Sequence, residues 1–506
     1  MSETSVTIPT SLSPFADMFQ DRVLIREFED SLIPNNLWGA ICPEADVWPN
    51  HAGLTYTVTN DGYYPIVAVT SPSNVDPTPR GRRAEQYDIS LGLYTDTDDI
   101  NATNAQSMLA DYGKQTINRL GVNAAETLDV AARGRYVSAA TAGWTVADGA
   151  QGPSTTIKVM RLNGFTTALP LTGGNIRHTP VSAGNPLKVL IAGVANEVIG
   201  YIADNNIAID IGVPVDDEVG PGSLLLRNPV TVANRDPIIA ESASWIQRSG
   251  AGYNPLTGKI DDVAAPLSYA DIRKARSRLS TTNVRGMRRY NNYYLTMISP
   301  TAYSQLQGDP EFQRLEQGRG VEDFPYVAAT VGFFAGHMFI ENNRAPGTDT
   351  MAWYQGTAAP GNESPNVYGS VTRFGVANCS TDACGIETIA NGDTGRPIDH
   401  TVIFGDDCAK QYWQPHAMLA QGNIAMLTDI GLAGILAEPY QVRNDGVYLT
   451  VDYTSLIMMS PRNRLGDQFP VTWYSKRSWQ LKSDQIATAG GKTRYKRMLT
   501  IQSDAR

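Results

Sequence analysis

Hydrophobic and polar side chains alternate along two stretches in the first fifth of the chain. The stretches are LTYTVT at residues 54–59 and YDISLGLY at residues 87–94. A period of two is typical of β-strands that turn one face toward a core. Because a polar segment joins the two stretches, they predict a long β-hairpin over residues 51–100.

The segment between the two strands is SPSNVDPTPRGRR, and its prolines and arginines predict an exposed, extended loop. Proline fixes its own φ angle and has no backbone N–H, so Pro72, Pro77 and Pro79 interrupt regular structure. The loop ends on three bases, Arg80, Arg82 and Arg83, whose charges do not suit a packed core.

A helical period predicts the longest element of the chain over residues 102–137. The small and apolar residues that recur there at spacings of three, four or their multiples are Leu109, Ile117, Leu120, Ala124, Leu128 and Ala131. At 1.5 Å per residue, such a helix is about 50 Å long. In a chain otherwise rich in strand patterns, we interpret it as a structural spine.

Other patterns predict shorter elements. DRVLIREFEDS at residues 21–31 predicts a short amphipathic helix, and residues 343–400 are expected to be rich in loops. Ser268 followed by Asp271 is a variant of the helix capping box and predicts a second helix. Runs such as KVLIAGV, SLLLRNPVTV, YYLTMISP, HMFIENN and FPVTWYSKRSW predict strands, with AYSQL as a short helix and QGDPEF as a polar link.

These elements predict an α+β protein built from six segments. The boundaries are an N-terminal arm at 1–50, the hairpin at 51–100, the spine helix at 101–142, an inserted β-rich domain at 143–264, a helix- and strand-containing domain at 265–460, and a C-terminal strand with a basic tail at 461–506.

The formal net charge of −10 disfavours a protein whose main task is to grip phosphates, since such proteins are usually basic. Bases nevertheless gather at residues 273–289 and 476–497. A solvated surface is the first interpretation of both clusters. Salt bridges to another subunit come second, because residues 1–30 hold six acids and two bases, and contact with DNA comes third.

The four cysteines are Cys42, Cys379, Cys384 and Cys408, too few for a disulfide scaffold in a chain of this length. The N-terminus lacks the pattern of a secretory signal, and the longest apolar run, at 189–195, is too short to span a membrane. We therefore expect a protein that folds in a reducing cytoplasm and does not enter a membrane.

The sequence contains no complete catalytic or metal-binding motif, so we expect no enzyme, no cofactor and no metal. Gly491, Lys492 and Thr493 end like a phosphate-binding loop, but Ile486 occupies the position of its first glycine. The five histidines form no H-x-x-x-H pair, and Cys379 and Cys384 have no second cysteine pair. Asp399–His400 and Asp406–Asp407 are more simply explained as surface residues than as metal ligands, and a Cys–His nucleophile pair stays open.

The order of the segments resembles the Hong Kong 97-like capsid fold of tailed phages, and in particular the major capsid proteins of the coliphage N-four type. DRVLIREFEDSLIP resembles the opening helix of that family, and AEQYDISLGLYTDTDDINA the return strand of its extended loop. TLDVAARGRYVSA resembles the end of its spine helix, and DIRKARSRLSTTN its first axial-domain helix. YYLTMISPTAYSQLQGDPEF, FAGHMFIENN and TVIFGDDCAKQYW resemble its later strands. The resemblance covers most of residues 15–140 and 265–480; the simplest members lack the segment 143–264.

This resemblance implies a major capsid protein that self-assembles through hexamers and pentamers into an icosahedral head. Segments 101–142 and 265–460 would then form the peripheral and axial domains. Portal and scaffold proteins would be partners, a decoration protein could dock on the inserted domain, and the head would enclose phage DNA without sequence-specific binding. Arg80, Arg82 and Arg83 would contact carboxylates of a neighbouring subunit, and the protein would be located in the virion after assembly in the host cytoplasm.

Two alternatives stay open. The same fold could serve as an encapsulin-like compartment shell, which encloses protein instead of DNA. The other alternative is a β-rich glycan-binding or glycan-cleaving protein, with segment 143–264 as its module between Trp144 and Trp245. That alternative predicts a small oligomer with aromatic side chains gathered in a groove.

Overall fold

The computed structural model describes most of the chain in separate ranges. They are residues 28, 30–32, 37–42, 44–48, 55–61, 84–101, 112–140, 142–159, 162–168, 178–203, 222–233, 236–241, 243–249, 265–282, 284–317, 330–341, 398–415, 440–443, 446–451, 453–459, 468–481, 483–488 and 491–504. Two compact units can be distinguished. Unit 1 comprises residues 1–56, 89–132 and 410–480, and unit 2 comprises residues 57–88, 133–409 and 481–506.

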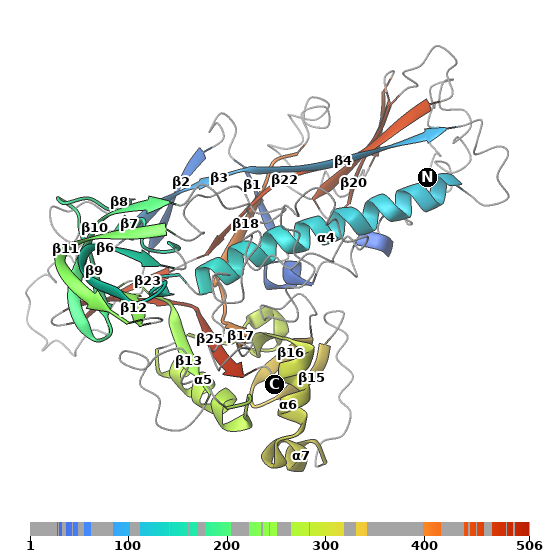
Figure 1. The fold of residues 1–506 in the computed structure, drawn as a ribbon. Coiled ribbons are helices and arrows are strands. Elements are labelled where there is room, and N and C mark those ends of the chain that lie inside the picture. The colour runs from blue at the N-terminus through green and yellow to red at the C-terminus, as the bar shows by residue number, and fades with distance from the viewer. Residues whose placement is uncertain are drawn as a thin grey trace, which may run out of the picture. The chain divides into compact units, whose positions relative to one another are not determined.

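Unit 1 contains a seven-stranded sheet in which sequence-distant strands are neighbours (Figure 1). The strand order is β1-β18-β22-β21-β20-β19, and β4 also pairs with β22. The strands are β1 (Ala45–Val47), β4 (Gly92–Asn101), β18 (Ala409–Trp413), β19 (Tyr440–Arg443), β20 (Gly446–Val451), β21 (Thr454–Met459) and β22 (Gln468–Leu481). The long β22 is the centre of this sheet, since it pairs with β4 along ten residues.

The predicted spine helix exists as α4 (Tyr112–Ala140), 29 residues long or about 43 Å. Five of the predicted core positions, from Ile117 to Ala131, are buried, whereas Leu109 lies outside the described residues. In unit 1 the helix is tied to the sheet, because the Trp473 indole N–H donates to the Asn123 side chain at 2.9 Å. The helix also continues three residues beyond the predicted end.

The described part of the N-terminal segment docks on α4. The backbone N–H of Trp38, at the start of the 3-10 helix η3 (Trp38–Ile41), donates to the buried Asp129 carboxylate at 2.6 Å. Gly121 lets Ser31 approach closely, since a Cβ at that glycine would overlap the serine hydroxyl. Phe28 and residues 30–32 are helical, and the rest of the helix predicted at 21–31 lies outside the described residues.

In unit 2, residues 144–240 form a six-stranded sheet with its own hydrophobic core. Its order is β5-β12-β9-β10-β11-β6, and a small two-stranded sheet, β7-β8, accompanies it. The strands are β5 (Trp144–Val146), β6 (Gln151–Val159), β7 (Thr167–Ala168), β8 (Thr179–Pro180), β9 (Leu187–Ile191), β10 (Val194–Ala203), β11 (Gly222–Val232) and β12 (Pro237–Ala240). The described part of segment 143–264 is thus rich in strands.

Side chains of the edge strand β6 form hydrogen bonds with backbone groups of the same strand. The Gln151 amide accepts from the Lys158 N–H at 2.9 Å and donates to the Lys158 carbonyl at 3.0 Å. The Ser154 hydroxyl similarly accepts from the Thr156 N–H and donates to its carbonyl. Because these backbone groups already have partners, this part of the edge is a poor template for pairing with a strand of another chain.

A second six-stranded sheet of unit 2 has the order β13-β25-β17-β14-β16-β15. Its members are β13 (Trp245–Arg248), β14 (Tyr294–Ile298), β15 (Thr330–Phe334), β16 (His337–Glu341), β17 (Ile398–Phe404) and β25 (Met498–Asp504). One face packs on three helices around a core that includes Ile272, Leu306 and Phe312. The helices are α5 (Tyr269–Thr281), α6 (Pro300–Gln307) and α7 (Pro310–Gln317). β13 therefore belongs to this sheet, although the sequence prediction groups it with segment 143–264.

Local signals explain where these helices begin. Ser268 caps α5 as predicted, since its side chain accepts from the Asp271 backbone N–H. Ser299 caps α6 in the same way through Ala302. The prediction of a polar link at QGDPEF was wrong for its second half, where Pro310 opens α7 and the Asp309 carboxylate accepts from the Glu311 N–H at 2.8 Å.

Two further strand pairs stand apart from the large sheets. The predicted hairpin corresponds to the pair β2 (Thr55–Asp61) and β3 (Ala84–Ser90), and a second pair joins β23 (Ser483–Thr488) to β24 (Gly491–Lys496). Gly491, Lys492 and Thr493, the incomplete phosphate-loop ending, therefore belong to a strand. No helix within the described ranges is both long and apolar enough to cross a membrane.

Candidate assembly surfaces

Arg80, Arg82 and Arg83, the predicted contact residues, lie outside the described residues. In the sequence they directly precede Ala84, the first residue of β3. Their contact with a neighbouring subunit therefore stays a prediction, and the surface that can be analysed is the ribbon formed by β2 and β3.

Polar side chains hold the β2–β3 ribbon together across its two strands. The Thr57 hydroxyl donates to the Asp88 carboxylate at 2.6 Å, and the Gln86 amide donates to the Thr59 hydroxyl at 3.0 Å. Among the ribbon side chains whose exposure is described, only that of Ile89 is buried. The opposite face of β2 is apolar: Tyr56 and Val58 are half-buried, and Tyr56 packs edge to face against Trp48 and Tyr412.

One backbone hydrogen bond ties β3 to another part of unit 2. The N–H of His178, directly before β8, donates to the carbonyl of Gln86 at 2.8 Å. A two-stranded ribbon is at best marginally stable in water without a third strand or a packed face. The ribbon is therefore an element that would gain stability from a further packing partner.

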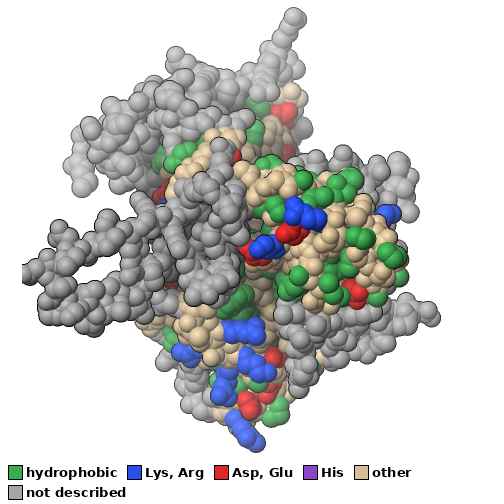
Figure 2. Space-filling view, turned by 90° about the vertical axis from the view of Figure 1, so that its left-hand side faces the viewer, with side chains coloured by type: hydrophobic (Ala, Val, Ile, Leu, Met, Phe, Trp, Pro, Cys, Tyr) green, Lys and Arg blue, Asp and Glu red, His purple; other side chains and the backbone are tan. Residues whose placement is uncertain are grey.

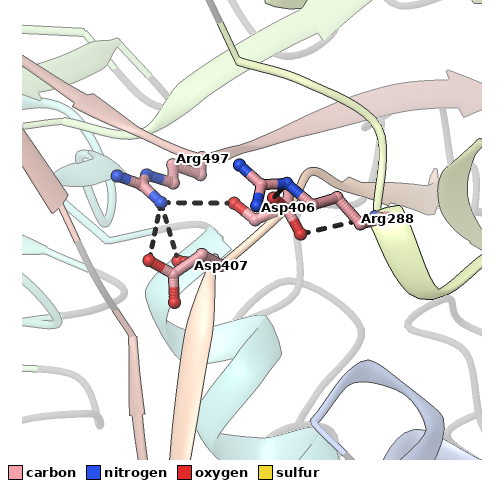
Figure 3. A network of polar contacts seen from close by, with 4 residues as sticks. All are labelled: Arg288, Asp406, Asp407 and Arg497. Atoms are coloured by element: carbon pink, nitrogen blue, oxygen red, sulfur yellow. Dashed lines mark hydrogen bonds and ion pairs between the residues drawn. The ribbon is translucent and has the colours of Figure 1, made fainter. Parts of the chain in front are cut away.

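A second polar feature is a charged clamp around the turn between β17 and β18 (Figure 3). The Arg497 guanidinium contacts the Asp407 carboxylate at 2.9 Å, while Arg288 pairs with Asp406 at 3.4 Å. Arg497 also donates to the carbonyls of both aspartates. The Arg288–Asp406 pair ties the turn to residues 285–290, and the Arg497–Asp407 pair ties it to the chain directly before β25.

For two of the C-terminal bases, Arg477 and Arg497, the prediction of a solvated surface was wrong. Arg497 is 7% exposed and Arg477 is 2% exposed. Arg477 donates to the hydroxyls of Ser475 and Thr454 at 2.8 and 2.7 Å. Both arginines are thus buried inside the chain and are not free to bind another subunit.

The possible ligand pairs named from the sequence do not form a metal site. Asp399 and His400 are both 1% exposed, contrary to the expectation of surface residues, and they lie on opposite faces of β17 because successive strand side chains alternate. Asp399 accepts from the Ser299 hydroxyl at 2.7 Å, and His400 contacts Gln502 at 3.2 Å. Within the described ranges, no group of three or more His, Cys, Asp or Glu side chains could hold a metal ion.

The cysteines offer no reactive pair within the described residues. Cys42 and Cys408 are both free thiols, and Cys408 is buried. Cys379 and Cys384 lie outside the described ranges, as does nearly all of the predicted loop segment 343–400.

Aromatic residues do cluster, but their side chains are buried or half-buried. In unit 1, Trp48, Tyr56 and Tyr412 meet edge to face, with ring centroids 5.6 to 6.3 Å apart. Burial and then the negative charge of Asp46 raise the pKa of Tyr412 to about 12. In unit 2, Trp144 is 3% exposed and lies under the Arg248 guanidinium, 4.7 Å from the ring centroid. Neither site offers the open aromatic platform that a glycan-binding groove would need.

The sequence interpretation missed the buried His337. Its Nδ1 lies 3.0 Å from the Thr296 hydroxyl, and its ring is fully buried. Burial, and then the positive charge of Arg276 on α5, lower the pKa of His337 to about 3. The strand pattern could have revealed it, since His337 has the same parity as the core residue Phe339 in β16.

No protein-family model matches the chain, and no curated protein matches it in sequence. Solved structures do match across nearly its whole length. The capsid of Ralstonia phage GP4 is 10% identical with a TM-score of 0.44, covering 95% of this chain and 91% of that one. The capsid of cyanophage Pam1 is 9% identical with a TM-score of 0.42, covering 100% and 94%. The acidic stable capsid of Helicobacter pylori bacteriophage KHP30 is 10% identical with a TM-score of 0.40, covering 93% and 91%.

All three are phage capsids. The order of segments in the sequence resembles that of proteins of this kind. Since their TM-scores are 0.44 or lower, the functional proposal takes its support from the chain's own residues.

The clamp predicts unequal effects for two matched substitutions. Arg497→Gln removes the interactions of an arginine side chain that is 9% exposed and should lower the free energy of unfolding by about 1–3 kcal/mol. Arg288→Gln removes a pair whose arginine is 76% exposed and should cost less than about 1 kcal/mol. Chemical denaturation of both variants checks this, and equal losses would contradict the assignment of Arg497 as the anchoring residue.

His337 predicts a loss of stability in acid. Between about pH 6.5 and pH 3, the unfolded chain binds a proton at this histidine and the folded chain does not. The free energy of unfolding should therefore decrease as the pH is lowered through this range, by up to about 1.4 kcal/mol per pH unit. His337→Asn, which cannot titrate, should remove this contribution.

The matched control for this prediction is Phe339→Leu, which perturbs the same core but keeps the histidine. It should destabilise the chain at neutral pH and leave the dependence on acid unchanged. The measurement is denaturant unfolding at pH 7 and pH 4.5. If His337→Asn loses stability between these pH values as steeply as the unsubstituted protein, the neutral buried imidazole is the wrong account.

Proposed function

We propose that this chain is a structural shell protein, the major capsid protein of a tailed phage, which self-assembles into a closed icosahedral head around double-stranded DNA. The observation that carries the proposal is the β2–β3 ribbon. In the segment order that resembles the capsid family it precedes a 29-residue helix, and among its side chains whose exposure is described only that of Ile89 is fully buried.

The physical reasoning concerns what a ribbon of this kind needs. Its own strands are joined by side-chain bonds such as Thr57–Asp88, and His178 contributes one backbone bond from outside. Strand pairs of this size become stable when they gain a third strand or a packed face. In a closed lattice every copy can supply that face to its neighbour, so the need is met at all positions by one repeated contact.

The described chemistry also suits a structural role. The clamp at Arg497 and Asp407 is balanced in charge, and Asp399, His400 and Arg477 are engaged in buried contacts. These polar groups fix turns and strands relative to one another within their units. Portal, scaffold and decoration proteins, and assembly in the host cytoplasm, are further parts of the proposal.

The arginines before β3 offer the mutational test. Charge reversal at Arg80, Arg82 and Arg83 to Glu should abolish shell formation, because the bases would no longer meet carboxylates of the neighbouring subunit. The control replaces all three by Lys, which keeps the charge and should keep assembly. Sedimentation and negative-stain microscopy measure the particles, and circular dichroism verifies folding of each variant. Normal shells from the folded Glu variant would refute this contact.

The content of the particles separates the proposal from a compartment shell. Particles from infected cells should hold DNA that survives external nuclease treatment. Particles that instead retain a protein cargo and no DNA would support the encapsulin-like alternative.

A further inference from the structure

The stretch around α5 is the most one-sided in charge within the whole chain. Residues 272–308 contain no aspartate or glutamate, yet the first half of this stretch carries seven bases. All seven side chains are exposed. They are Arg273, Lys274, Arg276 and Arg278 on α5, then Arg285, and finally Arg288 and Arg289 in the 3-10 helix η5 (Arg288–Tyr290). We name these seven residues the α5 basic surface.

The fold forces these charges outward and close together. Ile272, Ala275 and Leu279 bury one side of α5 in the core, so the bases occupy the remaining surface of the helix. Lys274 and Arg278 are four residues apart, and Arg273 and Arg276 are three apart, so like charges face each other along the helix. Such pairs repel, and an anion bound between them would relieve the repulsion.

Few carboxylates neutralise this surface. Asp271 is buried at the start of α5 and lies 3.9 Å from Lys274, and Asp406 pairs with Arg288. Within the described ranges, no ion pair involves Arg273, Arg276, Arg278 or Arg285. In Figure 2, blue side chains gather on the lower part of the face, with a few red ones beside them.

The side chains between the bases indicate which polyanion fits. Ser277, Ser280 and Thr281 are exposed there, and none of them is apolar. A protein segment that docks stably needs buried apolar or aromatic anchors. A phosphate backbone needs only cations and hydrogen-bond donors, and guanidinium groups bind phosphate through two parallel bonds.

We propose that the α5 basic surface binds the phosphate backbone of double-stranded DNA. Because the chain as a whole carries a net charge of −10, its attraction for DNA has to come from locally basic surfaces such as this one. The inference rests on the proposed function for its biological meaning: in a shell, the α5 basic surface is the part turned toward the packaged DNA.

The test measures binding of the full chain to a short fluorescent DNA duplex at several salt concentrations. Each phosphate contact contributes about −0.9 to the slope of log K against log salt, so the four arginines that form no ion pair within the described ranges predict a slope of about −3.6. Arg278→Glu with Arg285→Glu should make the slope shallower by about 2 and weaken binding about tenfold or more at 50 mM salt.

The matched control is Lys158→Glu with Lys188→Glu. These two exposed lysines lie on β6 and β9, and their reversal changes the net charge by the same amount. Binding by this variant should stay within about twofold of the unsubstituted protein, because neither lysine belongs to the α5 basic surface and salt screens long-range charge effects. Equal weakening in both variants would overturn the proposal, because it would show a general charge effect.

Two other outcomes would also overturn it. One is the absence of DNA binding by the unsubstituted protein at about 50 mM salt. The other is that the protein binds a synthetic peptide of residues 1–30 but not DNA, and that Arg278→Glu with Arg285→Glu abolishes the peptide binding. This result would assign the surface to the acidic segment of a second copy. Particle formation is measured in parallel. Shells without DNA affinity refute this inference alone, and DNA affinity without shells refutes the proposed function alone.

Discussion

A two-stranded β-ribbon is at best marginally stable in water without a further packing partner, and the account of this chain depends on that constraint. The β2–β3 ribbon has cross-strand bonds such as Thr57–Asp88, one backbone bond from His178 and the packing of Tyr56 against two aromatic rings, but only Ile89 is fully buried among its described side chains. The large sheets differ, because each buries a core of its own or packs on helices. A ribbon that is incomplete in one copy makes sense in a protein that works as many copies.

The two six-stranded sheets of unit 2, in contrast, have hydrophobic cores of their own. The sheet formed by residues 144–240 encloses its own core and closes part of its edge with Gln151 and Ser154. The sheet that carries β17 and β25 holds several of its buried polar residues by specific contacts, such as Asp399 with Ser299. Arg497 then fastens the following turn through Asp407. Sheets with cores of their own, together with a ribbon that lacks one, fit a subunit whose ribbon packs against a neighbouring copy.

Much of this fold could be predicted from local pattern. The helical period gave α4, the Ser268 cap gave the start of α5, and alternation gave the strands of the ribbon. The helix α7 was missed although Asp309 and Pro310 form a recognised start signal, because the following residues are largely polar. KVLIAGV contains two strands and not one, since Ala192 and Gly193 adopt positive φ angles and reverse the chain.

The contacts of single side chains were harder to predict, and the reason is physical. Arg477 and Arg497 look like surface charges in a sequence, because their burial depends on partners as distant along the chain as Thr454 and Asp407. Asp399 and His400 are adjacent in sequence, but the strand directs them to opposite faces. The exposed bases of α5 could be predicted, since the positions of its buried residues follow directly from the helical period.

The size of the purified full-length protein tests the central claim most directly. Light scattering together with negative-stain microscopy should show rings or closed shells of many copies, in which amide hydrogen exchange of the β2–β3 ribbon is slow. A protein that stays monomeric at every concentration and salt condition, with the ribbon amides already protected in the monomer, would contradict the account, because the ribbon would then be complete without a neighbour.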